Sequence, residues 1–226
     1  MIKQLRTLVH NYLQHDKTGH GIDHIDRVTN LAVTFATKEK ANIELTTMIA
    51  LLHDVDDYKL VGLDKADHLG NTKKMLEIIK VPLSLQQKVL EGVGTIGFHK
   101  RLKGILPLFL EAKIVSDADM VDAIGAIGLM RAHTYSFQHQ EPFFDRDIFP
   151  LETMTLTEYT SPRKTTTVCH LFEKILKLKD FMMTAAGKEE ALKRHHVIVE
   201  FLRQYFVEME APAWSHYLEQ FLKTNR

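Results

Sequence analysis

The segment Met48–Leu52 is an unbroken apolar run that leads directly into His53-Asp54-Val55-Asp56-Asp57. Such a run predicts a buried helix that ends at a polar pocket. Burying bare charge beside it is expensive unless the charge is paired or binds a metal. Neutral imidazole and carboxylate are ligands that divalent metals accept. We therefore expect His53 and Asp54 to contribute to a cation site whose other ligands lie elsewhere in the chain.

The composition sets broad limits on the kind of protein. The 226 residues are enough for one large domain or two small ones, and 45% of them are hydrophobic, which suffices for a sizeable core. The chain has 29 basic residues (Lys and Arg) and 29 acidic residues (Asp and Glu), so the electrostatic field of the whole protein is weak. This balance argues against nucleic acid or an anionic membrane as the default partner.

The cysteine content and the distribution of apolar residues indicate the cellular compartment. A single cysteine, Cys169, excludes an intramolecular disulfide and suits a reducing compartment. The first residues are amphipathic and lack the apolar core of a signal peptide. No stretch approaches the roughly 20 apolar residues of a membrane span. We expect a cytoplasmic protein without a membrane partner.

Helical periodicity dominates the chain, and we find no convincing strand pair. The fold class expected is all-α, a single-domain helical bundle over residues 1–226. Gly125 and Gly128 weaken the helix that contains them and indicate a face where another helix packs closely. The expected helices cover residues 5–12, 25–36, 43–54, 69–80, 85–93, 109–131, 164–184, 188–209 and 214–222.

The pattern breaks in a long segment, 134–162. Three prolines punctuate it, and Phe143, Phe144 and Phe149 lie between them. A long irregular segment inside a compact domain is usually functional or disordered, and aromatic residues make disorder less favourable. We interpret this segment as a loop, with a lid as one candidate role.

Further candidate ligands lie upstream and downstream of His53. His20, His24 and Arg27 are spaced i, i+4, i+7, so they share a face if a helix begins near His20. A later start, with Asp23 as the N-cap, is equally compatible with the sequence. His24 then stands at the head of an amphipathic helix, where it can project into a shared pocket.

Carboxylates interrupt a second apolar helix at Asp117, Asp119 and Asp122. Asp119 and Asp122 share a face, and Asp117 points elsewhere. Each polar residue taken alone has an ordinary structural explanation, such as a cap or an ion pair. The conjunction of His24, His53-Asp54 and a late Asp is more specific, because two imidazoles and two carboxylates fill most of an octahedral divalent site.

A histidine, a distant His-Asp pair and a much later Asp resemble the signature of the HD-domain metal-dependent phosphohydrolases. The chain is similar to a bacterial branch of nucleotide pyrophosphohydrolases in His53–Lys59, Asp117–Asp119 and Gly125–Gly128, and this similarity continues into His170–Lys179. The resemblance therefore spans most of the chain. It implies an all-α fold and hydrolysis of phosphate esters or anhydrides, with a nucleoside triphosphate as the suggested substrate.

The resemblance also implies roles for individual residues. Asp57, three positions after the His-Asp aspartate, would orient or deprotonate the attacking water. Asp119 is preferred to Asp117 as a ligand, although a swap between the two stays open. Met120 stands where several branches carry a basic residue. The metal ligands implied are His24, His53, Asp54 and Asp119.

Phosphoryl transfer also needs cations against developing charge. Arg27 and Lys59 adjoin the ligand segments and are the predicted substrate-binding residues, and His20 is predicted to bind phosphate or to protonate a leaving oxygen. Lys59 has an alternative as a solvated side chain, and Arg27 as a structural partner of Asp119 or Asp122. Arg131, Lys174 and Lys177 are further candidates for phosphate contact.

The ligand set leaves the metal open. Mn is favoured because nitrogen and hard oxygen ligands are mixed and the chemistry is phosphate, with Mg, Fe, Ni, Co or Zn as alternatives. Asp54 also has the option of bridging a second ion. Three other functions remain open: an inactive regulatory domain that binds nucleotide, a phosphomonoesterase, and a structural all-α interaction protein. The oligomeric state is open too, with a homodimer as one option.

Overall fold

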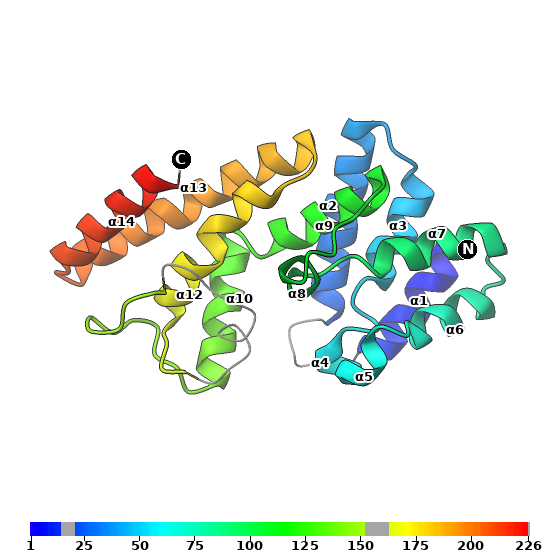
Figure 1. Cartoon of the computed structure of the whole chain (residues 1–226), viewed down its shortest axis with the longest axis horizontal. Helices are drawn as coiled ribbons and strands as arrows, with labels where there is room; N and C mark the ends of the chain where they lie inside the picture. The colour runs from blue at the N-terminus through cyan, green and yellow to red at the C-terminus, as the bar shows by residue number, and fades with distance from the viewer. Residues whose placement is uncertain (15–20, 152–162, 226) are drawn as a thin grey trace. The chain divides into compact units, whose positions relative to one another are not determined.

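The computed structural model describes residues 1–14, 21–151 and 163–225 (Figure 1). In these ranges all regular structure is helical and no strand occurs, so the expected all-α fold is confirmed. In the same described part, no helix has both the length and the apolar character to cross a membrane. The elements are α1 (Ile2–Leu13), α2 (Ile22–Glu39), α3 (Ile43–Leu52), α4 (Tyr58–Val61), α5 (Leu63–Ala66), α6 (Gly70–Ile78), α7 (Leu83–Val93), α8 (Phe98–Leu102), α9 (Leu110–Asp122), α10 (Gly125–Gln138), α12 (Thr167–Glu173), the 3-10 helix η1 (Ile175–Phe181), α13 (Ala185–Glu208) and α14 (Pro212–Thr224).

The chain forms two compact units. The first comprises Met1–Met120 and Met183–Gly187, and the second comprises Val121–Met182 and Lys188–Arg226. Helices α9 and α13 each contribute residues to both units. The expectation of one domain over residues 1–226 stays a prediction.

Helix α3 is the core of the first unit. Every residue from Leu45 to Leu52 is buried, as expected for a helix that is apolar on all sides. It begins at the N-cap Asn42, whose side chain accepts a hydrogen bond from Leu45 N, and it packs against α1, α2 and α7 (Figure 1). The helix ends at Leu52, two residues earlier than expected, so His53 and Asp54 lie just beyond its last turn.

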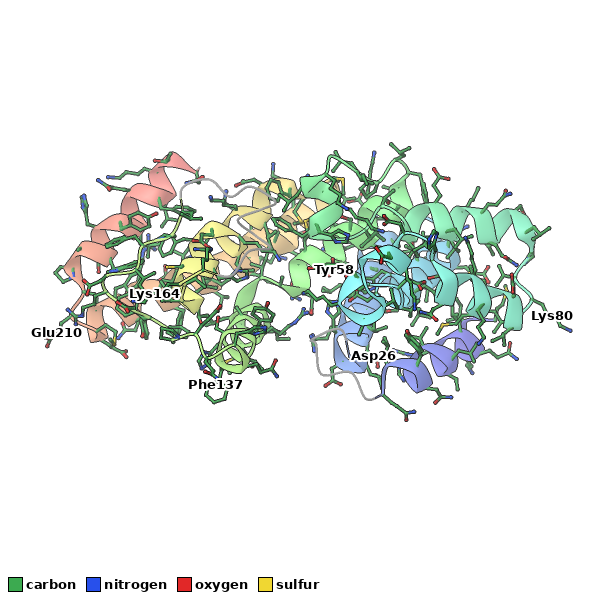
Figure 2. All side chains as sticks on the ribbon, turned by 60° about the horizontal axis from the view of Figure 1, so that its bottom comes forward. Asp26, Tyr58, Lys80, Phe137, Lys164 and Glu210 are labelled. Atoms are coloured by element: carbon green, nitrogen blue, oxygen red, sulfur yellow. The ribbon has the colours of Figure 1, made fainter. Side chains whose placement is uncertain are left out.

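Polar contacts between α1 and α2 hold the segment that carries His24. Asp26, labelled in Figure 2, accepts hydrogen bonds from Arg6 Nη2 at 2.6 Å and from His10 Nε2 at 3.0 Å. Helix α2 begins at Ile22 with Gly21 as its N-cap. His24 therefore lies in the first turn of α2. The helix begins between the two starts that the sequence allowed, and Asp23 as the N-cap is wrong, because Asp23 is already inside the first turn.

The single helix expected over residues 109–131 is wrong. The chain leaves the helical path between α9 and α10, where Gly125 has a φ of 84°, a conformation that favours glycine. A Cβ added at Gly128 would lie 2.1 Å from the carbonyl oxygen of Ala123, so the break between α9 and α10 needs glycine there as well. The close helix contact expected at this motif is present at Gly125, where a Cβ would lie 3.0 Å from Cβ of Arg194 on α13.

Two boundaries in the second unit also differ from expectation. The loop expected over residues 134–162 starts later, because α10 continues to Gln138. The helix expected over residues 164–184 is two elements, α12 and η1, which separate at Lys174 with a non-helical φ of -128°. Periodicity alone does not distinguish a short α-helix that continues as a 3-10 helix from one continuous helix.

The aromatic residues of the loop pack against helices of the second unit, where Phe143 and Phe144 are partly buried and Phe149 is exposed. Phe149 stacks on Trp214 of α14 with ring centroids 4.5 Å apart, and Phe144 meets the same ring edge-on at 5.2 Å. Phe143 contacts Tyr205 of α13 at 5.0 Å. These contacts anchor the described part of the loop on α13 and α14. The lid stays a prediction, and residues 152–162 of the segment lie outside the described residues.

Candidate metal centre

His53 is held in a defined orientation at the end of α3. Its Nδ1 lies 2.7 Å from the carbonyl oxygen of Ala50. A carbonyl oxygen only accepts hydrogen bonds, so we assign the ring proton to Nδ1, which leaves the lone pair of the neutral ring on Nε2. A backbone acceptor of this kind fixes both the tautomer and the ring direction of metal-binding histidines.

The structure brings the four predicted ligand residues together in the first unit. His24 Nε2 lies 3.3 Å from His53 Nε2 and 3.2 Å from Asp54 Oδ2. Asp119 Oδ1 lies 3.5 Å from His24 Nε2 and 4.0 Å from His53 Nε2. One ligand atom each of His24, His53 and Asp119 falls within 4.8 Å of the other two. Asp54 Oδ2 also lies 3.4 Å from His53 Nε2, so it faces both imidazoles.

This donor set fits a divalent cation. Nitrogen lone pairs and carboxylate oxygens converge on one point, and without a cation or protons between them they would repel one another. In an octahedral site with metal–ligand bonds of about 2.1 Å, neighbouring ligand atoms lie about 3 Å apart. The observed separations of 3.2 to 3.5 Å for four of the pairs are close to that spacing. The residues present therefore match the requirements of such an ion.

Asp117 and Asp119 occupy different environments. Asp117 is fully buried, and its carboxylate accepts hydrogen bonds from Met183 N at 2.9 Å, Thr184 N at 2.8 Å and Thr184 Oγ1 at 2.7 Å. Burial raises the pKa of this carboxyl, and the hydrogen bonds from Thr184 and Met183 only partly oppose that rise. Because these donors precede α13, Asp117 stabilises the start of that helix. Asp119 is the carboxylate that faces the imidazoles.

The three carboxylates that follow His53 have three separate roles in the fold. Asp54 faces the imidazoles, as described above. Asp56 accepts hydrogen bonds from Asn71 N at 2.9 Å and Thr72 N at 2.8 Å, in the first turn of α6. Asp57 is the N-cap of α4, and its Oδ1 accepts from Lys59 N at 2.9 Å.

Asp57 stands three positions after Asp54, but the two residues do not lie on one face of a continuous helix. Helix α3 has already ended, and Asp57 N donates to Asp54 O at 3.0 Å within a turn. The physical reason is that Asp is a strong N-cap, so it starts α4 instead of continuing α3. The role of Asp57 at the attacking water stays a prediction.

The predicted substrate-binding residues differ in their surroundings. Arg27 is half-buried on α2, three residues after His24. Lys59 is exposed, with Nζ 6.0 Å from the ring centroid of Tyr58, a position compatible with a solvated side chain. His20 lies outside the described residues. Arg131, a further candidate for phosphate contact, lies in the second unit and forms an ion pair with Asp122 at 2.5 Å. The roles of Arg27, Lys59 and His20 stay predictions.

The basic helix α8 was not predicted from the sequence. His99, Lys100 and Arg101 are consecutive in this short helix, and Lys100 is only 7% exposed. His99 meets the ring of Tyr58, labelled in Figure 2, with centroids 5.0 Å apart. Burial lowers the pKa of both His99 and Lys100, against the opposing effect of nearby carboxylates. The signal was available as four basic residues between Gly97 and Gly104, but such runs usually face solvent.

Comparison with known proteins identifies the family. The HD domain model matches residues 21–124, a range that contains all four predicted ligands. YpgQ of Bacillus subtilis is 30% identical over 203 residues, which cover 89% of this chain and 90% of that protein. The chain belongs to the HD superfamily. It is a metal-dependent phosphohydrolase of this superfamily, as the resemblance implied.

Solved structures agree with this assignment for the HD protein. A protein from Lactobacillus plantarum has a TM-score of 0.79 and 36% identity, covering 93% of this chain and 97% of that one. An HD-superfamily hydrolase from Bacillus thuringiensis has a TM-score of 0.71 and 30% identity, covering 93% and 97%. YpgQ in complex with ADP has a TM-score of 0.72 and 26% identity, covering 92% and 97%.

Proposed function

We propose that this HD protein is a nucleoside triphosphate pyrophosphohydrolase that uses Mn²⁺ held by His24, His53, Asp54 and Asp119. The observation that carries the proposal is the convergence of two imidazole nitrogens and two carboxylates at separations between 3.2 and 4.0 Å. Support for a nucleotide comes from YpgQ, a relative whose structure holds ADP. Mn²⁺ is chosen because it accepts both imidazole nitrogen and carboxylate oxygen.

A divalent ion held by His24, His53, Asp54 and Asp119 would lower the pKa of a bound water towards neutrality and would polarise a phosphoryl oxygen. The chain supplies the remaining groups. Asp57 orients the water and accepts its proton as the water oxygen bonds to the α-phosphorus. The bond between that phosphorus and the bridging oxygen breaks, and pyrophosphate leaves with the electron pair. Arg27 and Lys59 balance the phosphate charge, and His20 protonates the leaving oxygen.

The products of a nucleotide panel test this proposal. The protein loaded with Mn²⁺ is incubated with ribonucleoside and deoxyribonucleoside triphosphates, nucleoside monophosphates and a simple phosphomonoester, and orthophosphate and pyrophosphate are assayed separately. We expect pyrophosphate and a nucleoside monophosphate from at least one triphosphate. Reconstitution of stripped protein with Mg, Fe, Ni, Co or Zn in turn is expected to give lower rates than Mn.

Three outcomes of the same panel would contradict the proposal. Orthophosphate released mainly from monoesters would indicate a phosphomonoesterase. Nucleotide binding without any product would indicate a regulatory domain. A folded protein that binds neither metal nor nucleotide would indicate a structural interaction protein.

Asp57→Asn is expected to lower kcat about 100-fold, which is the lower end of the range for a general base. The variant should keep its Mn²⁺ content and its Tm, because Asn is as good an N-cap for α4 as Asp. Rates are measured under saturating substrate, and metal is measured by mass spectrometry. Asp64→Asn, which removes an exposed carboxylate from α5, is the matched control. Full activity of Asp57→Asn would remove this residue from the mechanism.

A further inference from the structure

The turn of residues 53–57 lies between α3 and α4 and carries several groups of the predicted site. His53 and Asp54 are predicted metal ligands, and Asp57 is the predicted water-activating residue. The backbone here is a non-helical turn, in which Asp57 N donates to Asp54 O at 3.0 Å. Metal ligands must be held to within about 0.5 Å of the productive geometry. A turn of this kind therefore depends on contacts with neighbouring elements to hold its side chains in place.

The carboxylate of Asp56 binds this turn to the start of α6. Its Oδ1 accepts a hydrogen bond from Asn71 N at 2.9 Å, and its Oδ2 accepts from Thr72 N at 2.8 Å and from Thr72 Oγ1 at 2.7 Å. Asp56 is 6% exposed and Thr72 is 0% exposed. Removing a buried acceptor leaves its donors without a partner, which costs more than the loss of an exposed hydrogen bond. Asp56 therefore holds the middle of the turn firmly against α6.

Asn71 adds a second connection to the same turn. Its Nδ2 donates to the carbonyl oxygen of Val55 at 3.2 Å and to the hydroxyl oxygen of Tyr12, on α1, at 3.0 Å. Val55 is fully buried. Helix α6 itself packs against α1 and α7 (Figure 1). The turn that follows Asp54 is thus connected through α6 to the packed helices of the first unit.

Asp56 also takes the place of an N-cap for α6. Leu69 occupies the N-cap position with a φ of 51°, and its side chain makes no capping hydrogen bond. Leucine has no acceptor for the free N–H groups of a first turn, and the left-handed conformation is unfavourable for it. Asn71 and Thr72 are the second and third residues of α6, whose N–H groups a capping oxygen normally satisfies. The start of α6 and the turn after α3 therefore stabilise each other through one carboxylate.

Asp117 makes the same kind of contact elsewhere in the first unit. Its carboxylate accepts from two backbone N–H groups and one threonine hydroxyl, as that of Asp56 does. The two carboxylates differ in the backbone that carries them. Asp117 lies within α9, a helix of 13 residues whose internal hydrogen bonds set the direction of Asp119. Asp56 lies in a turn, so its carboxylate does for the turn what the helical hydrogen bonds do for α9.

We propose that Asp56 is a positioning residue of the metal centre. By holding the turn against α6, it fixes the direction in which Asp54 presents its carboxylate to the ion, and it places Asp57 at the start of α4. Asp56 acts through the backbone of the turn and touches neither the ion nor the substrate. This inference rests on the proposed function, because it takes Asp54 as a ligand of the metal.

The Kd for Mn²⁺ tests this role independently of activity. It is measured by isothermal titration calorimetry on the metal-stripped full chain, at a temperature where circular dichroism shows the variants to be folded. Asp56→Ala should raise the Kd about 10-fold or more, the usual cost of removing a group that orients a metal ligand. Thr72→Val keeps the shape of the side chain and removes one of the three hydrogen bonds, so it should raise the Kd less, by about threefold. At saturating Mn²⁺, Asp56→Ala should lower kcat more than it changes KM, because Asp54 and Asp57 share the turn.

Asp117→Ala is the matched control, because it removes hydrogen bonds of the same kind from a helix start. Both alanine variants should show a similar fall in the Tm of the metal-free protein, and the Kd of Asp117→Ala for Mn²⁺ should stay at the wild-type value. An unchanged Kd in Asp56→Ala, or an equal rise in both alanine variants, would overturn the inference. If Asp56→Ala does not fold, Thr72→Val decides the question, and a wild-type Kd in that variant would overturn the inference as well.

Failure of the proposed function gives a different result. A wild type that binds Mn²⁺ with an Asp56-dependent Kd and cleaves no triphosphate would contradict the proposed reaction and support this inference. A wild type that cleaves triphosphates with Mn²⁺, while Asp56→Ala keeps both the Kd and the kcat of the wild type, would overturn this inference alone.

Discussion

Replacing His53 by alanine is expected to abolish metal binding and phosphohydrolase activity together. The Nε2 atom of this residue faces His24, Asp54 and Asp119, and its Nδ1 is fixed by the Ala50 carbonyl. Metal catalysis contributes several kcal/mol to a reaction of this kind, so the rate should fall by about 1,000-fold or more. Metal is measured by mass spectrometry on dialysed protein, and activity is measured on the best substrate of the nucleotide panel.

Thermal unfolding gives an independent measure of the same loss. Mn²⁺ at about 100 times its Kd should stabilise the wild type by about 2.7 kcal/mol, which raises the Tm by about 5–10 °C in a chain of this length. His53→Ala should show no such rise, whereas His196→Ala, which removes an exposed imidazole from α13, should keep it. Retention of a full metal equivalent by His53→Ala would exclude this residue as a ligand.

Asp117→Ala is expected to unfold the protein more easily while it leaves the metal in place. The substitution strips the acceptor from Met183 N, Thr184 N and Thr184 Oγ1 at the start of α13. The loss of a cap and of buried hydrogen bonds should cost about 3 kcal/mol. The Tm should then fall by about 6–12 °C, and the Mn²⁺ content of the protein that remains folded should be unchanged.

Asp119→Ala, two residues away on the same helix, provides the matched control. It should lose metal and activity and keep a Tm close to that of the metal-free wild type, because the Asp119 side chain is partly exposed. The two variants thus separate the ligand role from the helix-capping role. Loss of metal in Asp117→Ala at temperatures where the protein is folded would reverse the assignment of these two carboxylates.

The sequence was informative wherever a pattern is local. The unbroken apolar run Met48–Leu52 predicted a buried helix, and α3 is buried from Leu45 onward. The all-α class followed from the same periodicity. The break between α9 and α10 was not foreseen, because it depends on the φ of Gly125 and on the approach of Ala123 to Gly128, which one-dimensional spacing does not encode.

The candidate site was predictable to the extent that its residue types are unusual in their context. His53 and Asp54 stood out at the end of an apolar run, Asp119 within an apolar helix and His24 at the head of an amphipathic one. The structure places these four residues side by side. The function of Asp117 could not be deduced, because its partners Met183 and Thr184 are more than 60 residues away in the chain.

The central claim is that His24, His53, Asp54 and Asp119 hold one divalent ion. Anomalous diffraction from crystals grown with Mn²⁺, recorded at the manganese absorption edge, tests it most directly. The account predicts a peak about 2.0–2.3 Å from the Nε2 atoms of both histidines and from a carboxylate oxygen of each aspartate. A peak at another place in the protein, or well-ordered crystals without any peak between these four side chains, would contradict it.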